Sequence, residues 1–259
     1  MPQAAGLWYE WHGPEAGEVL ILSAGLGGTG SYWTPNLPAL AETYRVLVYD
    51  QLGTGRSRGA LPPELSVEAM ADDLLGLINA LGLVGVTLIG HAAGAAIALA
   101  LTLKAPRLID RIVAVNAWAS PDPHFIRCFE TRLTLLDDSV EAYLHAQPIF
   151  LYPARWSSAH DAELRAEASH QLLSFQGEEN ITARIMALCR FDVAARLGRI
   201  SAPTLVIAAE DDMLVPASCS ERLAAGLPNA THVSMTGGHA CNVTDPGTFD
   251  RLVLEFLRS

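Results

Sequence analysis

Several features that mark other classes of protein are scarce in this sequence. Lysine and arginine number 17 against 28 aspartate and glutamate residues, a formal net charge of −11, so a basic nucleic-acid surface is not expected. The longest apolar run, Ala92 to Leu103, is far shorter than the ~20 residues that a membrane-spanning helix needs. The opening residues MPQAAGLWYEWHG lack a basic segment followed by an apolar one, so we expect no secretory leader and no membrane partner.

Cysteine is also rare, and no cofactor signature is present. The four cysteines are widely separated without a C-x-x-C pair, which fits a reducing cytoplasm better than a disulfide framework. The histidines show no metal-ligand spacing, and neither a P-loop nor a dinucleotide-binding turn occurs. We therefore expect a cytoplasmic protein with no metal and no cofactor, whose partner is a small-molecule substrate; a homodimer would be an ordinary assembly for it.

Short apolar runs alternate with helical patterns along the 259 residues, which is typical of a parallel sheet covered by helices on both faces. The runs predict strands at Leu7–Trp11, Val19–Ser23, Arg45–Tyr49, Val86–Ile89, Arg111–Asn116, Thr204–Ala208 and His232–Met235. Helices are predicted over Val67–Leu81, with Ser66 as its N-cap, and over Ala93–Lys104, Ser218–Gly226 and Thr248–Leu257.

One long interval interrupts this alternation. About 85 residues separate the strand that ends near Asn116 from the strand that starts at Thr204, too many for a loop in a compact domain. We predict that residues 119–192 form a helical cap, inserted into a core made of residues 1–118 and 193–259. The cap should cover the carboxyl edge of the sheet, where open parallel sheets bind ligands.

A strand, a sharp turn and an Ala-rich helix are predicted from Leu88 to Pro106. The turn, Gly90 to Gly94, has the shape of the G-x-S-x-G nucleophile elbow of hydrolases, but its middle residue is Ala92. An alanine methyl group cannot attack a substrate. His91, beside it, is predicted either to support the site from within the core or to line the substrate pocket.

An acid and a base follow the elbow in the chain order of α/β hydrolases. His239 comes after the strand at 232–235, and Asp212 stands four residues before Pro216 in a stretch similar to G-x-x-D-x-x-V-P. Asp212 is therefore predicted to orient His239, whereas Asp211 is assigned to the turn. The glycine-rich turn after the strand at 19–23 should supply the backbone N–H of Leu26, and the elbow that of Ala93, as an oxyanion hole.

Ala92 leaves three interpretations open. A serine could have been replaced to trap a substrate, in which case the native enzyme is an esterase that forms an acyl-enzyme. The protein could instead only bind a ligand on a hydrolase scaffold. In the third interpretation, the reaction needs acid–base chemistry and water but no covalent nucleophile.

The chain resembles the RutD family of α/β-hydrolase-fold proteins, which acts in the Rut pathway of pyrimidine degradation. The resemblance covers almost the full length and rests on "GLGGTGSYW" (Gly25–Trp33), "YDQLGTG" (Tyr49–Gly55), "IGHAAGA" (Ile89–Ala95), "RCFETR" (Arg127–Arg132), "AQPIFLYPARW" (Ala146–Trp156), "FQGEEN" (Phe175–Asn180) and "GGHACNVTDPGTF" (Gly237–Phe249). It implies a native small residue at position 92. It also implies breakdown of carbamate to carbon dioxide and ammonia, or of 3-aminoacrylate to malonic semialdehyde and ammonia, and leaves the choice between them open.

The substrate pocket is the least determined part of the site. Trp33, Trp118 and Trp156 are candidate wall residues, although aromatic side chains are common in cores as well. An anionic substrate also calls for a cation, and the cap offers Arg127, Arg132, Arg155 and Arg190. The sequence does not choose among these four arginines.

Overall fold

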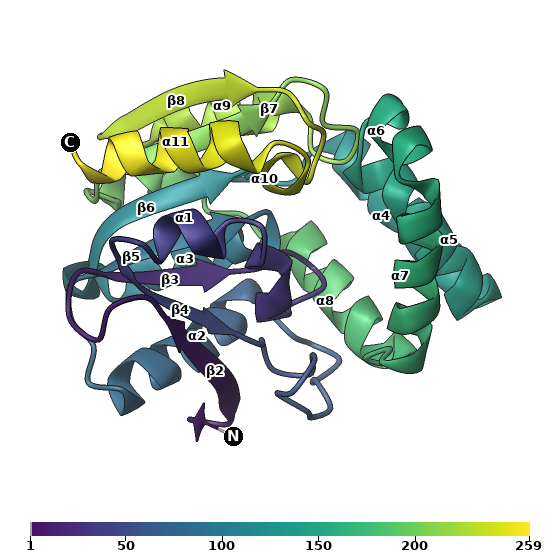
Figure 1. Ribbon diagram of the computed structural model, residues 1–259, viewed down its shortest axis with the longest axis horizontal. Helices are drawn as coiled ribbons and strands as arrows, with labels where there is room; N and C mark the ends of the chain where they lie inside the picture. Colours follow the sequence, from purple (N-terminus) through teal and green to yellow (C-terminus); the bar gives the residue numbers. More distant parts are fainter. Residues whose placement is uncertain (1) are drawn as a thin grey trace.

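A single eight-stranded sheet runs through the computed structural model, which describes residues 2–259 (Figure 1). Its strands are β1 (Gln3–Ala4), β2 (Leu7–His12), β3 (Val19–Ser23), β4 (Arg45–Tyr49), β5 (Val86–His91), β6 (Ile109–Val115), β7 (Thr204–Ala209) and β8 (Ala230–Met235). Each predicted strand is present, with ends that differ by at most two residues, and the two-residue β1 was not anticipated. The predicted fold class is confirmed.

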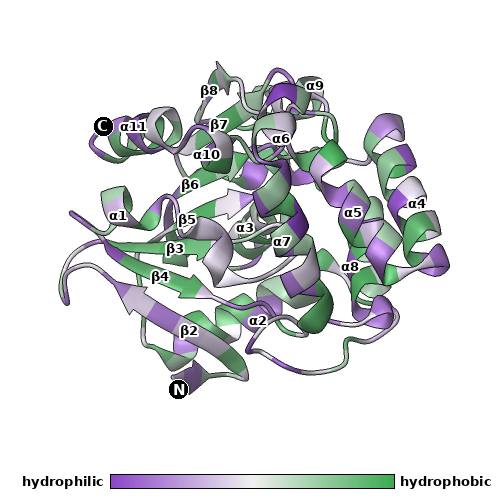
Figure 2. Cartoon of the chain, turned by 45° about the vertical axis from the view of Figure 1, so that its right-hand side comes forward, coloured by the Kyte–Doolittle hydropathy of each residue, from purple (hydrophilic) through white to green (hydrophobic). Residues whose placement is uncertain are grey.

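The strand order is β1-β2-β4-β3-β5-β6-β7-β8. The strands β4, β3, β5, β6, β7 and β8 are all parallel to one another. The strand β2 pairs with the other edge of β4 in the antiparallel direction. Every residue of β3, β5 and β7 is buried, as expected for strands covered on both faces. Figure 2 shows β3 and β4 as largely hydrophobic, whereas β2, near the sheet edge, carries a long hydrophilic stretch.

Helices cover both faces of the sheet, and each face has its own hydrophobic cluster. One cluster joins the sheet to α2 (Val67–Ala80), α3 (Ala93–Lys104) and α9 (Ala217–Gly226). The other joins it to η1 (Gly30–Trp33), α1 (Leu37–Leu40) and α11 (Pro246–Leu257). The predicted N-cap is confirmed, because the Ser66 hydroxyl accepts from the Ala69 N–H at 3.1 Å. Short elements at η2 (Pro106–Leu108), η3 (Ala194–Arg199) and α10 (Cys241–Thr244) complete the core.

The long interval between β6 and β7 is helical. It contains α4 (Pro123–Asp138), α5 (Val140–Leu151), α6 (Ala154–Ala159), α7 (Asp161–Leu173) and α8 (Glu178–Arg190). Figure 1 shows these helices beyond the arrowheads of β3, β6 and β8, on the side of the sheet where the strands end. The exact division into core and cap stays a prediction, and residues 119–192 are called the cap below. None of the helices in residues 2–259 has the length and apolarity to cross a membrane.

Candidate active site

The turn between β5 and α3 has the backbone of a nucleophile elbow. Ala92, at its apex, has φ 47° and ψ −106°, a strained conformation for a residue with a side chain. The flanking glycines make the turn sterically feasible. A Cβ on Gly94 would lie 2.0 Å from the Ser23 carbonyl oxygen, and one on Gly90 would lie 2.5 Å from the Ala95 nitrogen. The elbow is therefore built as in a hydrolase, but its apex carries a methyl group.

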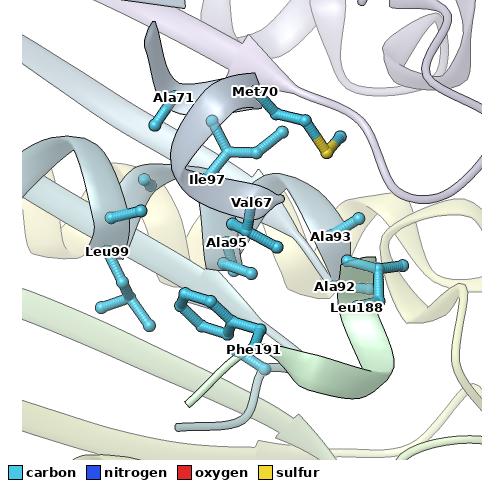
Figure 3. Packing of buried hydrophobic residues seen from close by; sticks show 14 of the residues in the cluster. Val67, Met70, Ala71, Ala92, Ala93, Ala95, Ile97, Leu99, Leu188 and Phe191 are labelled. Carbon is cyan, nitrogen blue, oxygen red and sulfur yellow. The ribbon is translucent and has the colours of Figure 1, made fainter. Parts of the chain in front are cut away.

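The cluster that contains Ala92 and Ala93 extends from the elbow into the cap. It includes Leu188 of α8 and Phe191, which follows that helix (Figure 3). Ala92 is 6% exposed. The apex of the elbow is thus enclosed by the cap as well as by the sheet.

His239 and Asp212 form a buried acid–base pair. The His239 Nδ1 lies 2.7 Å from the Asp212 Oδ2. The Asp212 Oδ1 accepts from the N–H groups of Leu214 and Val215 at 2.7 and 2.9 Å, which fixes the carboxylate as an acceptor. The imidazole must then carry its proton on Nδ1, and its Nε2 is left with the lone pair of a general base.

The neighbouring aspartate has a different task. The Asp211 Oδ1 accepts from the N–H groups of Gly237 and Gly238, both at 2.9 Å. Asp211 therefore shapes the turn that precedes His239. This is the division of roles between Asp211 and Asp212 that the sequence spacing predicts.

The main chain of His239 is held by two side chains beneath it. Its carbonyl oxygen accepts from the His91 Nε2 at 2.7 Å and from the Asn116 Nδ2 at 2.8 Å. The Asn116 Oδ1 in turn accepts from the Ala209 N–H at 2.7 Å, so Asn116 connects the ends of β6 and β7 to the histidine loop. Asn116 has φ 48°, a conformation that asparagine tolerates better than most residues. Sequence reasoning did not single it out.

His91 is placed as a support rather than as a surface of the pocket. It is 3% exposed, its ring lies 4.7 Å from that of His239, and Tyr32 stacks on its other side at 4.8 Å. Burial, and then the nearby charge of His239, hold the pKa of His91 well below its usual 6.5. His91 is therefore neutral, and because a carbonyl only accepts, its proton lies on Nε2.

The loop expected to form the oxyanion hole is anchored through its carbonyl groups. Arg184 of α8 donates from Nε to the Leu26 carbonyl at 3.0 Å and from Nη2 to the Gly25 carbonyl at 3.5 Å. The Gln51 Nε2 donates to the Ala24 carbonyl at 2.7 Å, and the Gln51 Oε1 accepts from Arg184. The Gly25 carbonyl and the Leu26 N–H belong to one planar peptide unit and point in opposite directions.

The two expected oxyanion donors are consequently left for other partners. Within residues 2–259, neither the Leu26 N–H nor the Ala93 N–H donates to a backbone or side-chain acceptor.

Arg184 is 1% exposed, and burial lowers its pKa to about 10, so it stays positively charged at neutral pH. It was not among the arginines considered from the sequence, because nothing in the local pattern distinguishes it from exposed arginines on helices.

The three tryptophans occupy different environments. Trp33 is fully buried in the second hydrophobic cluster, where its ring centroid lies 6.1 Å from that of Phe249. Trp33 is therefore a core residue and not, as predicted, part of the pocket wall. Its neighbour Tyr32 is the ring that contacts His91. Trp118 is 1% exposed and packs against Phe125 of α4 at 5.0 Å, at the junction of core and cap. Trp156 lies within the cap, stacked between Tyr152 and His160 at 4.5 and 3.9 Å.

The turn at 50–57, which contains most of the "YDQLGTG" motif, is structural. Asp50 accepts from the N–H groups of Gly30 and Arg56 and pairs with the Arg56 guanidinium. Of the four cap arginines, Arg127, Arg155 and Arg190 are exposed and Arg132 is buried. In the part of the chain that the structure describes, no cluster of His, Cys, Asp and Glu could hold a metal ion.

Comparison with known proteins places this geometry in a family. A family model described as the alpha/beta hydrolase fold matches residues 18–171. Among solved structures, the enol-lactonase of Burkholderia xenovorans superimposes with a TM-score of 0.89 at 23% identity, covering 98% of this chain and 96% of that one. A hydrolase of Pseudomonas aeruginosa gives 0.85 at 28% identity, covering 98% and 94%. The chain belongs to the α/β hydrolase family.

Curated relatives narrow the assignment within that family. A protein of Caulobacter segnis named "Putative carbamate hydrolase RutD" is 51% identical over 97% of this chain and 96% of its own length. A protein of Agrobacterium fabrum with the same name is 46% identical over 96% and 97%. Identity at this level over nearly the whole length shows that the chain is a hydrolase of the RutD family.

Proposed function

We propose that the protein breaks down carbamate to carbon dioxide and ammonia, or 3-aminoacrylate to malonic semialdehyde and ammonia, using His239, Asp212 and water. The observation that carries the proposal is the buried pair of His239 Nδ1 and Asp212 Oδ2, 2.7 Å apart, beside an elbow whose apex has no nucleophilic atom. The names of the relatives support carbamate, and the resemblance that the motifs carry supports both substrates.

Neither reaction needs an acyl-enzyme. In carbamate, transfer of a proton to nitrogen allows the C–N bond to break, and its electron pair leaves with ammonia while carbon dioxide forms. In 3-aminoacrylate, a proton adds to the α-carbon to give an iminium ion, water attacks the iminium carbon, and ammonia then leaves. Each path begins with a proton given to the substrate, and we assign this step to the Nε2–H of His239 in its doubly protonated form. The neutral imidazole that remains then acts as a base and takes a proton back from water.

Asp212 fixes the tautomer of His239 and stabilises its protonated form. The N–H groups of Leu26 and Ala93 are proposed to bind a substrate oxygen that carries negative charge. A scaffold that only binds a ligand would have no use for the His239–Asp212 pair, and this supports an enzyme over a binding protein.

The direct test is ammonia release from each substrate, measured above the spontaneous rate, for the wild-type protein and His239→Ala. Because a positioned general acid–base contributes typically ~10²–10⁴-fold, the variant should lose most of the acceleration. Ligand binding measured by calorimetry, together with no acceleration by the wild-type protein, would favour the binding-protein interpretation. An unchanged rate in His239→Ala would show that the role assigned to this histidine is wrong.

A further inference from the structure

Two arginines of the cap are buried without an anionic partner. Arg132 of α4 is 3% exposed and Arg184 of α8 is 1% exposed. Within residues 2–259, neither guanidinium lies within 4.0 Å of a carboxylate oxygen. A buried charge is costly unless an opposite charge or a full set of hydrogen bonds compensates for it, so each site needs an explanation.

The two arginines differ in how far their hydrogen bonds are satisfied. Arg184 is occupied by the Leu26 carbonyl and the Gln51 side chain. Arg132 donates from Nη2 to the Tyr143 hydroxyl at 3.0 Å and to the Gln147 Oε1 at 2.6 Å. Its Nε is buried, however, and donates to no group in the described part of the chain. Arg132 therefore has an N–H available for a further acceptor.

The surroundings of Arg132 are suited to binding an anion. Its guanidinium carbon lies 5.5 Å from the ring centroid of Phe129, 5.3 Å from that of Tyr143 and 5.8 Å from that of Phe150. These rings limit access of water. In a medium of low polarity, a charge-assisted hydrogen bond to a carboxylate is stronger than it is in water.

One face of α4 lies against the loop that carries Asp212. The His124 Nε2 lies 2.8 Å from the Met213 carbonyl oxygen, and the Cys128 thiol lies 3.7 Å from the same oxygen. Met213 directly follows Asp212. Arg132 comes four residues after Cys128, on the next turn of the same helix face. Arg132 therefore lies one helical turn beyond the part of α4 that contacts Met213, the residue after Asp212.

We propose that Arg132 binds the carboxylate of the substrate through Nε, while Tyr143 and Gln147 hold its Nη2 in place. This inference rests on the proposed function, since carbamate and 3-aminoacrylate are both carboxylates with an amino group at the opposite end. In this arrangement Arg132 would hold one oxygen of the carboxylate and leave the other to the N–H groups of Leu26 and Ala93. It also explains why the cap buries this arginine and leaves Arg127, Arg155 and Arg190 exposed.

The test uses an unreactive pair of ligands, propionate and its uncharged counterpart propionamide, titrated into the full-length protein and followed by NMR. The wild-type protein should bind propionate more tightly than propionamide. Arg132→Gln should weaken propionate binding roughly tenfold or more, as expected for loss of a charge-assisted hydrogen bond, and should abolish the preference for the acid. Arg127→Gln, on the exposed side of the same helix, is the matched control and should bind like the wild type.

Two further variants separate this inference from the proposed function. Arg132→Lys keeps the charge but not the fork of donors, so it should bind propionate with intermediate affinity, and it serves if Arg132→Gln does not fold. His239→Ala should bind propionate like the wild type even though it has lost turnover. Equal propionate affinity in Arg132→Gln and Arg127→Gln would overturn the assignment, as would a wild-type protein that does not prefer propionate to propionamide.

Discussion

The Nε2 of His91 lies 2.7 Å from the main-chain carbonyl oxygen of His239, so one imidazole supports the backbone of the other. The contact does not engage the His239 side chain, whose Nδ1 is taken by Asp212. Asn116 donates to the same carbonyl at 2.8 Å. The position of the base is therefore set by two side chains that are not assigned any contact with substrate, and its tautomer is set by a third.

Replacing Asp212 by asparagine tests how much the carboxylate contributes to catalysis, because the His239 imidazole itself remains in the site. The amide cannot stabilise a protonated imidazole, and it permits the tautomer with the proton on Nε2, so we expect kcat to fall by about 10²–10⁴-fold. Asp211→Asn is the matched control, because the amide oxygen can still accept from the Gly237 and Gly238 N–H groups. Similar losses of kcat in the two variants would contradict the division of roles between the aspartates.

Restoring a serine at the elbow tests the esterase interpretation. If water is the attacking group, the new hydroxyl of Ala92→Ser competes with it, and we expect turnover to fall without a burst of nitrophenol from a nitrophenyl ester. Burst kinetics measured by stopped-flow absorbance decide the matter. A burst equal to the enzyme concentration that disappears in Ala92→Ser/His239→Ala would support an ancestral or native serine esterase instead.

Arg184 should affect catalysis through the loop it anchors. Arg184→Met leaves the carbonyls of Gly25 and Leu26 and the Gln51 Oε1 without their donor. The peptide unit that carries the Gly25 carbonyl and the Leu26 N–H is then free to turn. Because removal of one oxyanion donor costs ~10²–10³-fold, loosening one should lower kcat by roughly 10–10²-fold with a small change in KM. Arg184→Lys should recover part of the loss.

The control for Arg184 lies on the same helix. Arg190 also donates to a backbone carbonyl, that of Leu65 at 3.0 Å, but it does so at the end of α8 and is exposed. Arg190→Met should leave kcat unchanged when both variants are assayed alongside their free energies of unfolding. If Arg184→Met and Arg190→Met lose the same activity, the anchoring of the loop has no catalytic consequence.

The sequence predicts the sheet and the acid–base pair well because both depend on local patterns. Fully buried strands need continuous apolar runs, and the acid is located by its distance from Pro216. Patterns of this kind do not show which of two adjacent aromatic residues lies nearer the site. They favour Trp33, whereas Tyr32 is the residue that stacks on His91 and Trp33 packs on Phe249 in the core. They also do not reveal Arg184, which is buried by a contact with Leu26, 158 residues away in the chain.

His91 should leave a signature in the pH dependence of stability. Its pKa in the native protein is well below 6.5, chiefly because it is buried, whereas in the unfolded chain it returns to about 6.5. Between these two pKa values the unfolded state binds one more proton, so the free energy of unfolding falls as the pH drops below about 6.5, by up to ~1.4 kcal/mol per pH unit.

His91→Gln keeps a donor for the His239 carbonyl but does not titrate, so its free energy of unfolding should fall less steeply as the pH drops. Urea unfolding at a series of pH values measures this slope, with His170→Gln, an exposed position on α7, as the control. A slope in His91→Gln as steep as in the wild type would mean that His91 is not the neutral, buried histidine on which the support of His239 depends.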